Sequence, residues 1–426
     1  MLKFSEMKSD AHKNEIMDTL RRVVKSMPAY KELAYFVKIV GEHYLTDFEK
    51  GTPDIIVLGS DIPEELVLAA GKMPYWILGG SRASSLWADD LVPRDTDPVS
   101  RSGLGYLKAG FAEKALILIP LVNDSARKLA YILKSQDLKV HTVHFPPIKD
   151  AESRKEWNRQ YESCRSAITG HLKRPLTRRT LQRAMEKKKQ AREQIREFLS
   201  ASKGVLSGTG RMFVLNSYYC ADDLDEWSLQ LKGLTERLGK EKNRREKGRN
   251  KVLLLGSPVY FPNYKVPFLI EEAGLSLFLQ ADYTSLPLQM GICSDNENQD
   301  KFVENVYRND ASPAYVKNDS LYRQIVKLVS ENQIDGVVYH VLKGHIEYDF
   351  ELGRFEKLFE NMDIPVFRLE TDYNYQDVEQ LRIRLEAFSE VLNQRAYSGL
   401  PGTRKTVAGT AAERQRTNYG RDAVAI

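Results

Sequence analysis

Eight short apolar runs, arranged in two series of four, set the strongest limit on how this 426-residue chain can fold. The runs occupy residues 54–59, 75–80, 114–120 and 139–146 in the first series, and 251–258, 275–282, 336–343 and 364–371 in the second. Most of them are followed by a helix-like stretch. Continuous apolar strands that alternate with helices are typical of a parallel sheet covered on both faces. The pattern therefore predicts an α/β protein with two Rossmann- or flavodoxin-like parallel-sheet domains joined by a helical middle region.

The segments around these runs complete the predicted organisation. We expect N-terminal helices in 1–50, a first α/β domain in 51–150, a helical, basic connector in 151–250, a second α/β domain in 251–396 and a tail in 397–426. The individual helices that we expect at the two ends cover Asp10–Ser26, Tyr30–Glu49 and Gln376–Asn393. Within the connector, the Gly/Ser-rich stretch 204–213 predicts a break. The tail lacks apolar periodicity, which is typical of a disordered segment or of an extended arm on a partner.

The formal net charge of +5 is concentrated in three segments. Residues 171–200 hold ten Lys/Arg against three Glu, 236–251 hold eight against three, and the chain from Ala396 holds five against two, so the remainder is near −10. Acidic neighbours at helical spacing favour a solvated helix face. The alternative is a docking surface for an acidic partner or an anionic ligand. Aromatic interleaving and recognition motifs are missing, so we expect no nucleic-acid partner.

Several classes of protein are excluded or disfavoured. No run approaches the roughly 18 apolar residues of a membrane-spanning helix, and the first residues lack the apolar core of a signal peptide. The three cysteines, at 164, 220 and 293, form no CxxC pair and are too few for a disulfide framework. We therefore expect a reduced, cytoplasmic protein without a membrane partner.

Ligands of such folds bind at the carboxyl ends of the strands, so the loops after the apolar runs are the places to search. The loops concerned are 79–85, 121–125, 257–265, 343–349 and 370–373. Their candidate cleft residues are Ser81, Ser257, Lys343 and Glu370.

Each polar residue in these loops also has an ordinary structural interpretation. Gly79-Gly80-Ser81 lacks the GxGxxG spacing of a dinucleotide site and fits a turn, and Asn123 fits a helix N-cap. Ser257 is a hydroxyl donor or a cap, because no GxSxG surrounds it. His345 is most simply a surface hydrogen-bonding residue, with a ligand or acid–base role as the alternative.

The order of the loops resembles a known family. The segments LVPRDTDPVSRSGLGYL, LIPLVNDSARK, VLLLGSPVYFPNYKVPFLIEEAG, DGVVYHVLKGHIEYDFE and IPVFRLETDYNYQDVEQLRIRLEAFSEVL are together similar to the 2-hydroxyacyl-CoA dehydratase and benzoyl-CoA reductase family. The similarity runs from about Ile55 to Leu392 and is most specific in the last segment. It implies paired homologous subunits, 4Fe–4S clusters beside a CoA thioester, and an ATP-hydrolysing activator that delivers single electrons to form a ketyl radical anion.

The resemblance also implies where the cluster cysteines should stand. At those three loop positions this chain has Asp97, Asn123 and His345, and a further cysteine position of the family is Ser257. Thiolates are the ligands that suit an Fe–S cluster, so we expect this chain to bind none and a partner subunit to carry it. The cysteines at 164, 220 and 293 are expected to be small buried residues.

Three functions follow from this pattern. The first is a subunit without its own cluster, paired with a cysteine-complete homologous subunit that acts on an acyl-CoA substrate. The second is a stand-alone protein with a mononuclear metal at Asp97 and His345, completed by Glu347 or Asp349, or with no metal. The third is an assembly or scaffold factor for related Fe–S enzymes.

Overall fold

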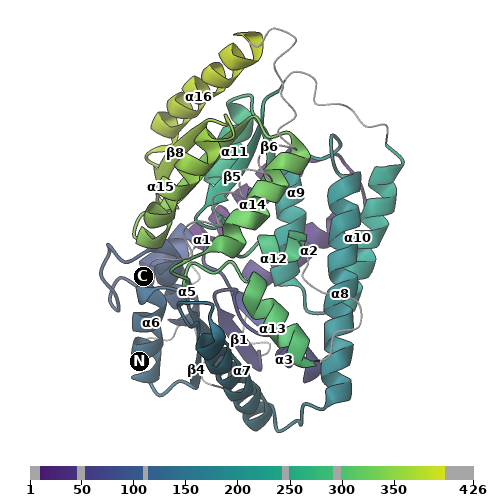
Figure 1. Cartoon of the computed structure of the whole chain (residues 1–426), viewed down its shortest axis with the longest axis vertical. Helices are drawn as coiled ribbons and strands as arrows, with labels where there is room; N and C mark the ends of the chain where they lie inside the picture. Colours follow the sequence, from purple (N-terminus) through teal and green to yellow (C-terminus); the bar gives the residue numbers. More distant parts are fainter. Residues whose placement is uncertain (1–9, 46–52, 109–113, 242–248, 291–298, 399–426) are drawn as a thin grey trace, which may run out of the picture.

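The computed structural model describes residues 10–45, 53–108, 114–241, 249–290 and 299–398 (Figure 1). It contains two four-stranded, all-parallel sheets with intervening helices, which confirms the predicted fold class. Each of the eight apolar runs forms one strand.

The first sheet has the strand order β2-β1-β3-β4. Its strands are β1 (Ile55–Leu58), β2 (Tyr75–Ile77), β3 (Leu116–Leu121) and β4 (Val140–His144). The helices that alternate with them are α3 (Glu64–Ala69), α4 (Arg82–Leu86), α5 (Pro98–Lys108) and α6 (Asp124–Lys134). All residues of β1 and β3 are buried, which explains why these two central strands are apolar without interruption.

The second sheet repeats this arrangement with the order β6-β5-β7-β8. Its strands are β5 (Lys251–Gly256), β6 (Ser276–Ala281), β7 (Gly336–Leu342) and β8 (Val366–Thr371). Its helices are α11 (Lys265–Glu272), α12 (Leu286–Met290), α13 (Gln299–Asn309), α14 (Asp319–Asn332), α15 (Ile346–Glu360) and α16 (Val378–Ser398). In each sheet the chain first adds a strand on one side of the starting strand and then crosses to the other side. The strand order thus reverses between β1 and β3 and between β5 and β7, where α/β proteins bind ligands.

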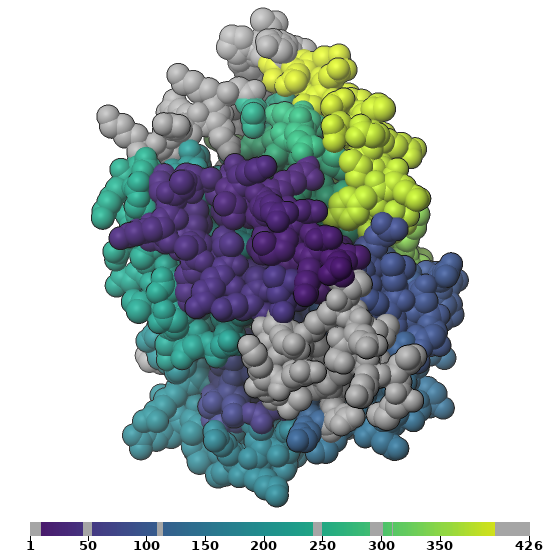
Figure 2. Space-filling view, turned by 180° about the vertical axis from the view of Figure 1, so that it is seen from behind, coloured from purple at the N-terminus to yellow at the C-terminus, as the bar shows by residue number. Residues whose placement is uncertain are grey.

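Two N-terminal helices, α1 (Asp10–Ser26) and α2 (Leu33–Leu45), cross the middle of the face shown in Figure 2. The Glu15 carboxylate accepts hydrogen bonds from the Ser81 hydroxyl and from the first backbone N–H groups of α4. Thr19 donates to the carbonyl of Pro262, 3.2 Å away, so α1 contacts both halves of the molecule. The predicted first helix is confirmed. The second begins at Leu33, three residues later than predicted, and ends at Leu45; the rest of its predicted range, 46–49, lies outside the described residues.

The middle region is helical, as predicted. It consists of α7 (Ala151–Leu172), α8 (Arg178–Ala201), α9 (Gly208–Asn216), the 3-10 helix η3 (Ser217–Cys220) and α10 (Leu224–Gly239). Helices α8 and α10 pack side by side along one edge (Figure 1). One continuous buried cluster unites residues of the N-terminal helices, the middle region and both sheets. Among the described residues, no helix has the length and apolar character needed to cross a membrane. Cys293 and the predicted tail beyond Ser398 lie outside them.

The break expected over 204–213 is wrong for its second half, where α9 begins at Gly208. Ser207 caps this helix by accepting a hydrogen bond from the Gly210 N–H at 3.0 Å. A Cβ atom placed on Gly208 would lie 1.9 Å from the carbonyl oxygen of Leu277 in β6. Gly208 therefore marks a close approach of helix to strand and not an interruption of the helix.

Replacement of Gly208 by alanine is expected to lower the free energy of unfolding by about 3 kcal/mol, because the added methyl group overlaps a strand backbone that cannot yield. Gly233 in α10, where a Cβ would meet nothing, is the matched control. The Gly233→Ala variant should gain about 0.5–1 kcal/mol through helix propensity. Urea denaturation of both variants measures these changes. Equal effects would contradict the close-approach explanation.

Candidate functional site

A cavity of about 50 Å³ lies where the strand ends of the two sheets meet. The first half contributes residues that follow or end β1, β2 and β3, and the second half contributes residues beyond β5, β6 and β7. The lining includes the polar side chains of Asp97, Asn123, Tyr260, Tyr283, His345, Glu347 and Tyr348. Three of the five loops that the strand-end rule selected from the sequence, 121–125, 257–265 and 343–349, therefore meet at this cavity, whereas 79–85 and 370–373 contribute no lining residue.

Asp97 and His345 form a buried pair across this cavity, with exposed fractions of 2% and 5%. The Nε2 atom of His345 lies 3.3 Å from Oδ1 of Asp97, and Nδ1 lies 3.2 Å from the Ser257 hydroxyl. Ser257 also accepts a hydrogen bond from the Leu342 N–H at 3.0 Å, and it caps no helix. The interpretation of His345 as a surface residue is wrong, because its polar partners come from loops distant in sequence and enclose it.

The two groups shift each other's ionisation. Burial acts most strongly on Asp97 and opposes its charge. The hydrogen bond and charge of His345, followed by the Ser100 N–H, outweigh burial and lower the pKa of Asp97 to about 2. Burial likewise favours neutral His345, but the hydrogen bond and charge of Asp97 outweigh it and raise the pKa of His345 above its usual 6.5. The pair is therefore carboxylate and imidazolium in mildly acidic solution.

This pair predicts a specific pH dependence of stability. A lowered carboxyl pKa stabilises the fold above about pH 4, and that contribution is lost as the pH falls towards 2. A raised imidazole pKa stabilises the fold below about pH 6.5, and that contribution is lost as the pH rises through the folded-state value. The His345→Gln variant keeps a donor but loses the charge, so it should be about 1–2 kcal/mol less stable than wild type near pH 5. The difference in stability between the variant and wild type should vanish in alkaline solution. Urea denaturation at a series of pH values measures this difference. A difference that does not change with pH would contradict the ion pair.

Asn123 lies at the same cavity and is confirmed as the N-cap of α6. Its Oδ1 accepts from the Ala126 N–H at 2.9 Å, and its Nδ2 donates to Glu347 at 3.1 Å. Asp97 caps α5 in the same way, accepting from the Ser100 N–H at 2.8 Å, and His345 directly precedes α15. Each of the three positions named by the resemblance thus stands at the start of a helix, and the three helices begin at one cavity.

The other candidate cleft residues do not line this cavity. Ser81 is fully buried and caps α4, accepting from the Ser84 N–H at 3.1 Å. Lys343 and Glu370 have side chains that are 62% and 43% exposed, and they pair with Asp372 and Arg368. The polar groups of these three residues are satisfied by contacts outside the cavity.

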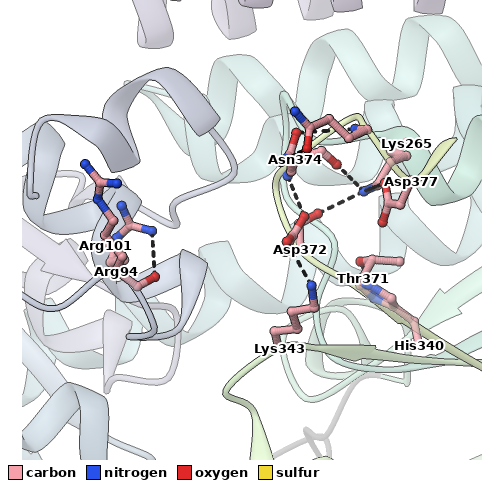
Figure 3. A network of polar contacts seen from close by, with 10 residues as sticks. Arg94, Arg101, Lys265, His340, Lys343, Thr371, Asp372, Asn374 and Asp377 are labelled. Atoms are coloured by element: carbon pink, nitrogen blue, oxygen red, sulfur yellow. Dashed lines mark hydrogen bonds and ion pairs between the residues drawn. The ribbon is translucent and has the colours of Figure 1, made fainter.

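Figure 3 shows the polar network around Asp372 at the end of β8. Lys265 is only 2% exposed, and its ammonium group donates to the carbonyls of Asp372 and Asn374 and to the carboxylate of Asp377, at 3.0, 2.6 and 2.7 Å. Lys343 reaches the Asp372 carboxylate at 3.2 Å. Lys265 therefore fixes the loop that connects β8 to α16.

A second cavity of about 100 Å³ lies beside the first, with Tyr283 lining both. Lys188 of α8 reaches into it and contacts Glu65 at 3.1 Å and Glu64 at 3.4 Å, while Tyr218 donates to Glu64 at 2.8 Å. All four side chains are buried. The indole N–H of Trp76, also buried here, has no hydrogen-bond partner among the described residues.

Asp61 and Asp310 line the same cavity. Burial first, and the charge of Asp310 second, raise the pKa of Asp61 well above its usual range; burial also raises the pKa of Asp310. Sequence reasoning missed this region, although Asp61 follows β1 by three residues. The strand-end rule, applied to the loop after the first apolar run as well, would have found it.

Among the described residues, no cysteine lines either cavity. Cys164 on α7 and Cys220 on η3 line neither of them and are buried; burial raises the pKa of the Cys164 thiol to about 12 and that of Cys220 further. They match the expected small buried residues. Within the part of the chain that the structure describes, no group of three or more His, Cys, Asp or Glu side chains could hold a metal ion.

Comparison with known proteins identifies the family. The model described as "2-hydroxyglutaryl-CoA dehydratase, D-component" matches residues 60–392. A protein of Escherichia coli (strain K12) named "Putative dehydratase subunit YjiM" is 24% identical over 355 residues, which cover 81% of this chain and 92% of the relative. The (R)-phenyllactyl-CoA dehydratase beta subunit of Clostridium sporogenes is 23% identical over 341 residues, which cover 78% of this chain and 89% of the relative. With its paired parallel sheets, its strand-end cavity and a family match over most of its length, the chain belongs to the 2-hydroxyglutaryl-CoA dehydratase D-component family.

Proposed function

We propose that this chain is the subunit without a cluster in a heteromeric 2-hydroxyacyl-CoA dehydratase or benzoyl-CoA reductase-type complex. The complex would act on acyl-CoA thioesters by ATP-driven transfer of low-potential electrons. The observation that carries the proposal is the cavity where Asp97, Asn123 and His345 meet. All three residues at the cluster-ligand positions that the resemblance implies line this cavity, but their side chains are a carboxylate, an amide and an imidazole.

The chemistry of this donor set does not fit a 4Fe–4S cluster, whose usual ligands are thiolates. Asp97 and His345 neutralise each other at 3.3 Å, and both polar atoms of the Asn123 amide are engaged by the protein. A cavity of about 50 Å³ has room for a few water molecules. We therefore assign the cluster to the partner subunit.

The partner in this proposal is a cysteine-complete homologous subunit, and an ATP-hydrolysing activator is the third component. One relative is by name the beta subunit of a dehydratase, which supports a heteromer. We expect the complex to be cytoplasmic. This chain would complete the subunit interface or shape the acyl-CoA channel, while the partner performs the electron transfer.

Iron and sulfide analysis tests the proposal. The purified chain, reconstituted anaerobically with iron and sulfide, should retain far less than one cluster per chain and show no broad visible absorbance. Co-expressed with a cysteine-complete homologous subunit, it should form a stoichiometric heteromer that does carry a cluster. Stoichiometric iron and sulfide on the isolated chain would overturn the proposal.

The same experiment separates the alternatives. One equivalent of metal without sulfide, lost in Asp97→Ala, would indicate a mononuclear site at Asp97 and His345. A transient and substoichiometric complex with the homologous subunit would indicate an assembly or scaffold factor.

A further inference from the structure

Five cationic side chains lie in the turn between α7 and α8 and in the first turns of α8. They are Lys173, Arg174, Arg178, Arg179 and Arg183, here called the basic turn, and all five are exposed. No Asp or Glu occurs in the chain between Glu162 and Glu186. The local excess of positive charge is therefore not balanced by neighbours in sequence.

The positive charge of the basic turn is not balanced by acidic side chains from other parts of the described structure either. Among the described residues, none of its five side chains forms an ion pair, and its one polar contact is a hydrogen bond from Arg174 to the carbonyl of Ala70 at 3.1 Å. Cations elsewhere in the middle region do have acidic partners: Lys155 with Glu152 at 2.6 Å and Arg159 with Glu156 at 2.5 Å. The solvated face predicted for residues 171–200 is thus confirmed for this turn, but the acidic neighbours at helical spacing do not pair with it.

Two of these arginines stand where a positive charge lowers the stability of the helix. Arg178 and Arg179 are the first two residues of α8, and its first turn contains no acidic residue. The positive end of the helix dipole lies there, so cations at these positions are unfavourable. Local stability therefore does not account for them, and residues that break a local rule without compensation often serve binding.

We propose that the basic turn is a docking surface for the acidic face of a protein partner. Four of its five cations are guanidinium groups, whose paired donors match carboxylates. Arg179 and Arg183 are one helical turn apart and present these donors side by side. Residues 171–183 contain no Phe, Tyr or Trp on which a base could stack, and Leu176 and Leu181 are buried and so cannot enter a lipid surface.

This inference rests on the proposed function in one respect: a partner that delivers electrons must bind and leave repeatedly. Charged surfaces suit that task because they accelerate association while leaving the complex sensitive to salt. The docking surface and the proposed function can still fail separately, because binding of an acidic probe is measured on this chain alone and requires neither a second subunit nor a cluster.

The probe is a fluorescently labelled polyglutamate peptide, and the measurement is fluorescence anisotropy at low and at physiological salt. The variant Arg178→Gln, Arg179→Gln, Arg183→Gln should raise the dissociation constant about tenfold. The matched control Lys38→Gln, Lys155→Gln, Arg159→Gln removes three exposed cations that have acidic partners on their own helices, and should raise it less than about twofold. Equal losses in both variants would overturn the proposal, because net charge alone would then explain binding.

Two further measurements complete the test. If the wild-type chain binds phosphatidylserine vesicles or a single-stranded oligonucleotide more tightly than polyglutamate, and the basic-turn variant loses that binding, the partner is not an acidic protein. Thermal unfolding supplies an independent readout: removal of Arg178 and Arg179 from the helix start should raise the Tm by about 1–3 °C. A fall in Tm would show that these arginines stabilise the fold, and would overturn the assignment of the basic turn to docking.

Discussion

The triple variant Asp97→Cys, Asn123→Cys, His345→Cys is expected to gain about four iron and four sulfide ions per chain on anaerobic reconstitution, where the wild-type chain retains only traces. The three positions line one cavity, so their replacement puts three thiols at the place where the family resemblance expects them. Removal of the Asp97–His345 pair also frees the volume that these side chains fill. Iron and sulfide assays, together with the visible absorption spectrum, measure the gain.

A serine version of the same triple variant is the matched control. Serine has nearly the size of cysteine but cannot supply a thiolate, so Asp97→Ser, Asn123→Ser, His345→Ser should bind no cluster. A cysteine variant that folds like wild type yet binds no iron would show that the loops themselves, and not only the three side chains, have departed from the family.

The second large effect concerns Lys188, whose replacement by methionine is expected to lower the free energy of unfolding by about 3–5 kcal/mol. Its ammonium group lies 3.4 Å from the Glu64 carboxylate and 3.1 Å from that of Glu65, whose exposed fractions are 5% and 1%. Methionine keeps the length of the side chain but leaves two carboxylates together in a buried cavity. Urea denaturation at neutral pH measures the loss.

Two companion variants separate charge from packing. Lys187→Met removes the neighbouring lysine, which is exposed and pairs with Asp225, and should cost less than about 1 kcal/mol. Addition of Glu65→Gln to Lys188→Met should recover about half of the loss, since only one buried carboxylate then remains without its cation. No recovery would mean that Lys188 acts through packing of its aliphatic chain.

The architecture could be predicted from the sequence because strands buried on both faces must be apolar throughout. All eight runs are strands, and the rule that ligands bind at strand ends selected the loops of Asn123 and His345, while the family resemblance added Asp97, which lines the same cavity. The burial of His345 could not be predicted, because its partner Asp97 lies 248 residues away and local sequence shows only a polar loop. Similarly, the sequence around Gly208 predicts a break in the helical region, because the close approach of the β6 backbone to this glycine cannot be known from local sequence.

Other residues escaped prediction for the same reason. Lys188 belongs to a run of three lysines that resembles a solvated helix face, yet α8 turns this one towards Glu64 and Glu65, more than 120 positions earlier. Ser81 and Lys343 follow strands as site residues should, but contacts with Glu15 and Asp372 occupy them instead. Position after a strand thus identifies the neighbourhood of a site, while the identity of its working side chains depends on contacts between distant segments.

The convergence of three helix starts on one cavity has an electrical consequence. Every peptide unit of α5, α6 and α15 adds to a dipole whose positive end faces the space between the two sheets. The main chain alone therefore imposes a positive potential there, independent of any lysine or arginine and unaffected by replacement of the side chains at these positions. A buried carboxylate such as Asp97 is tolerated in this field, and an occupant of the cavity would be held more firmly the more negative its charge.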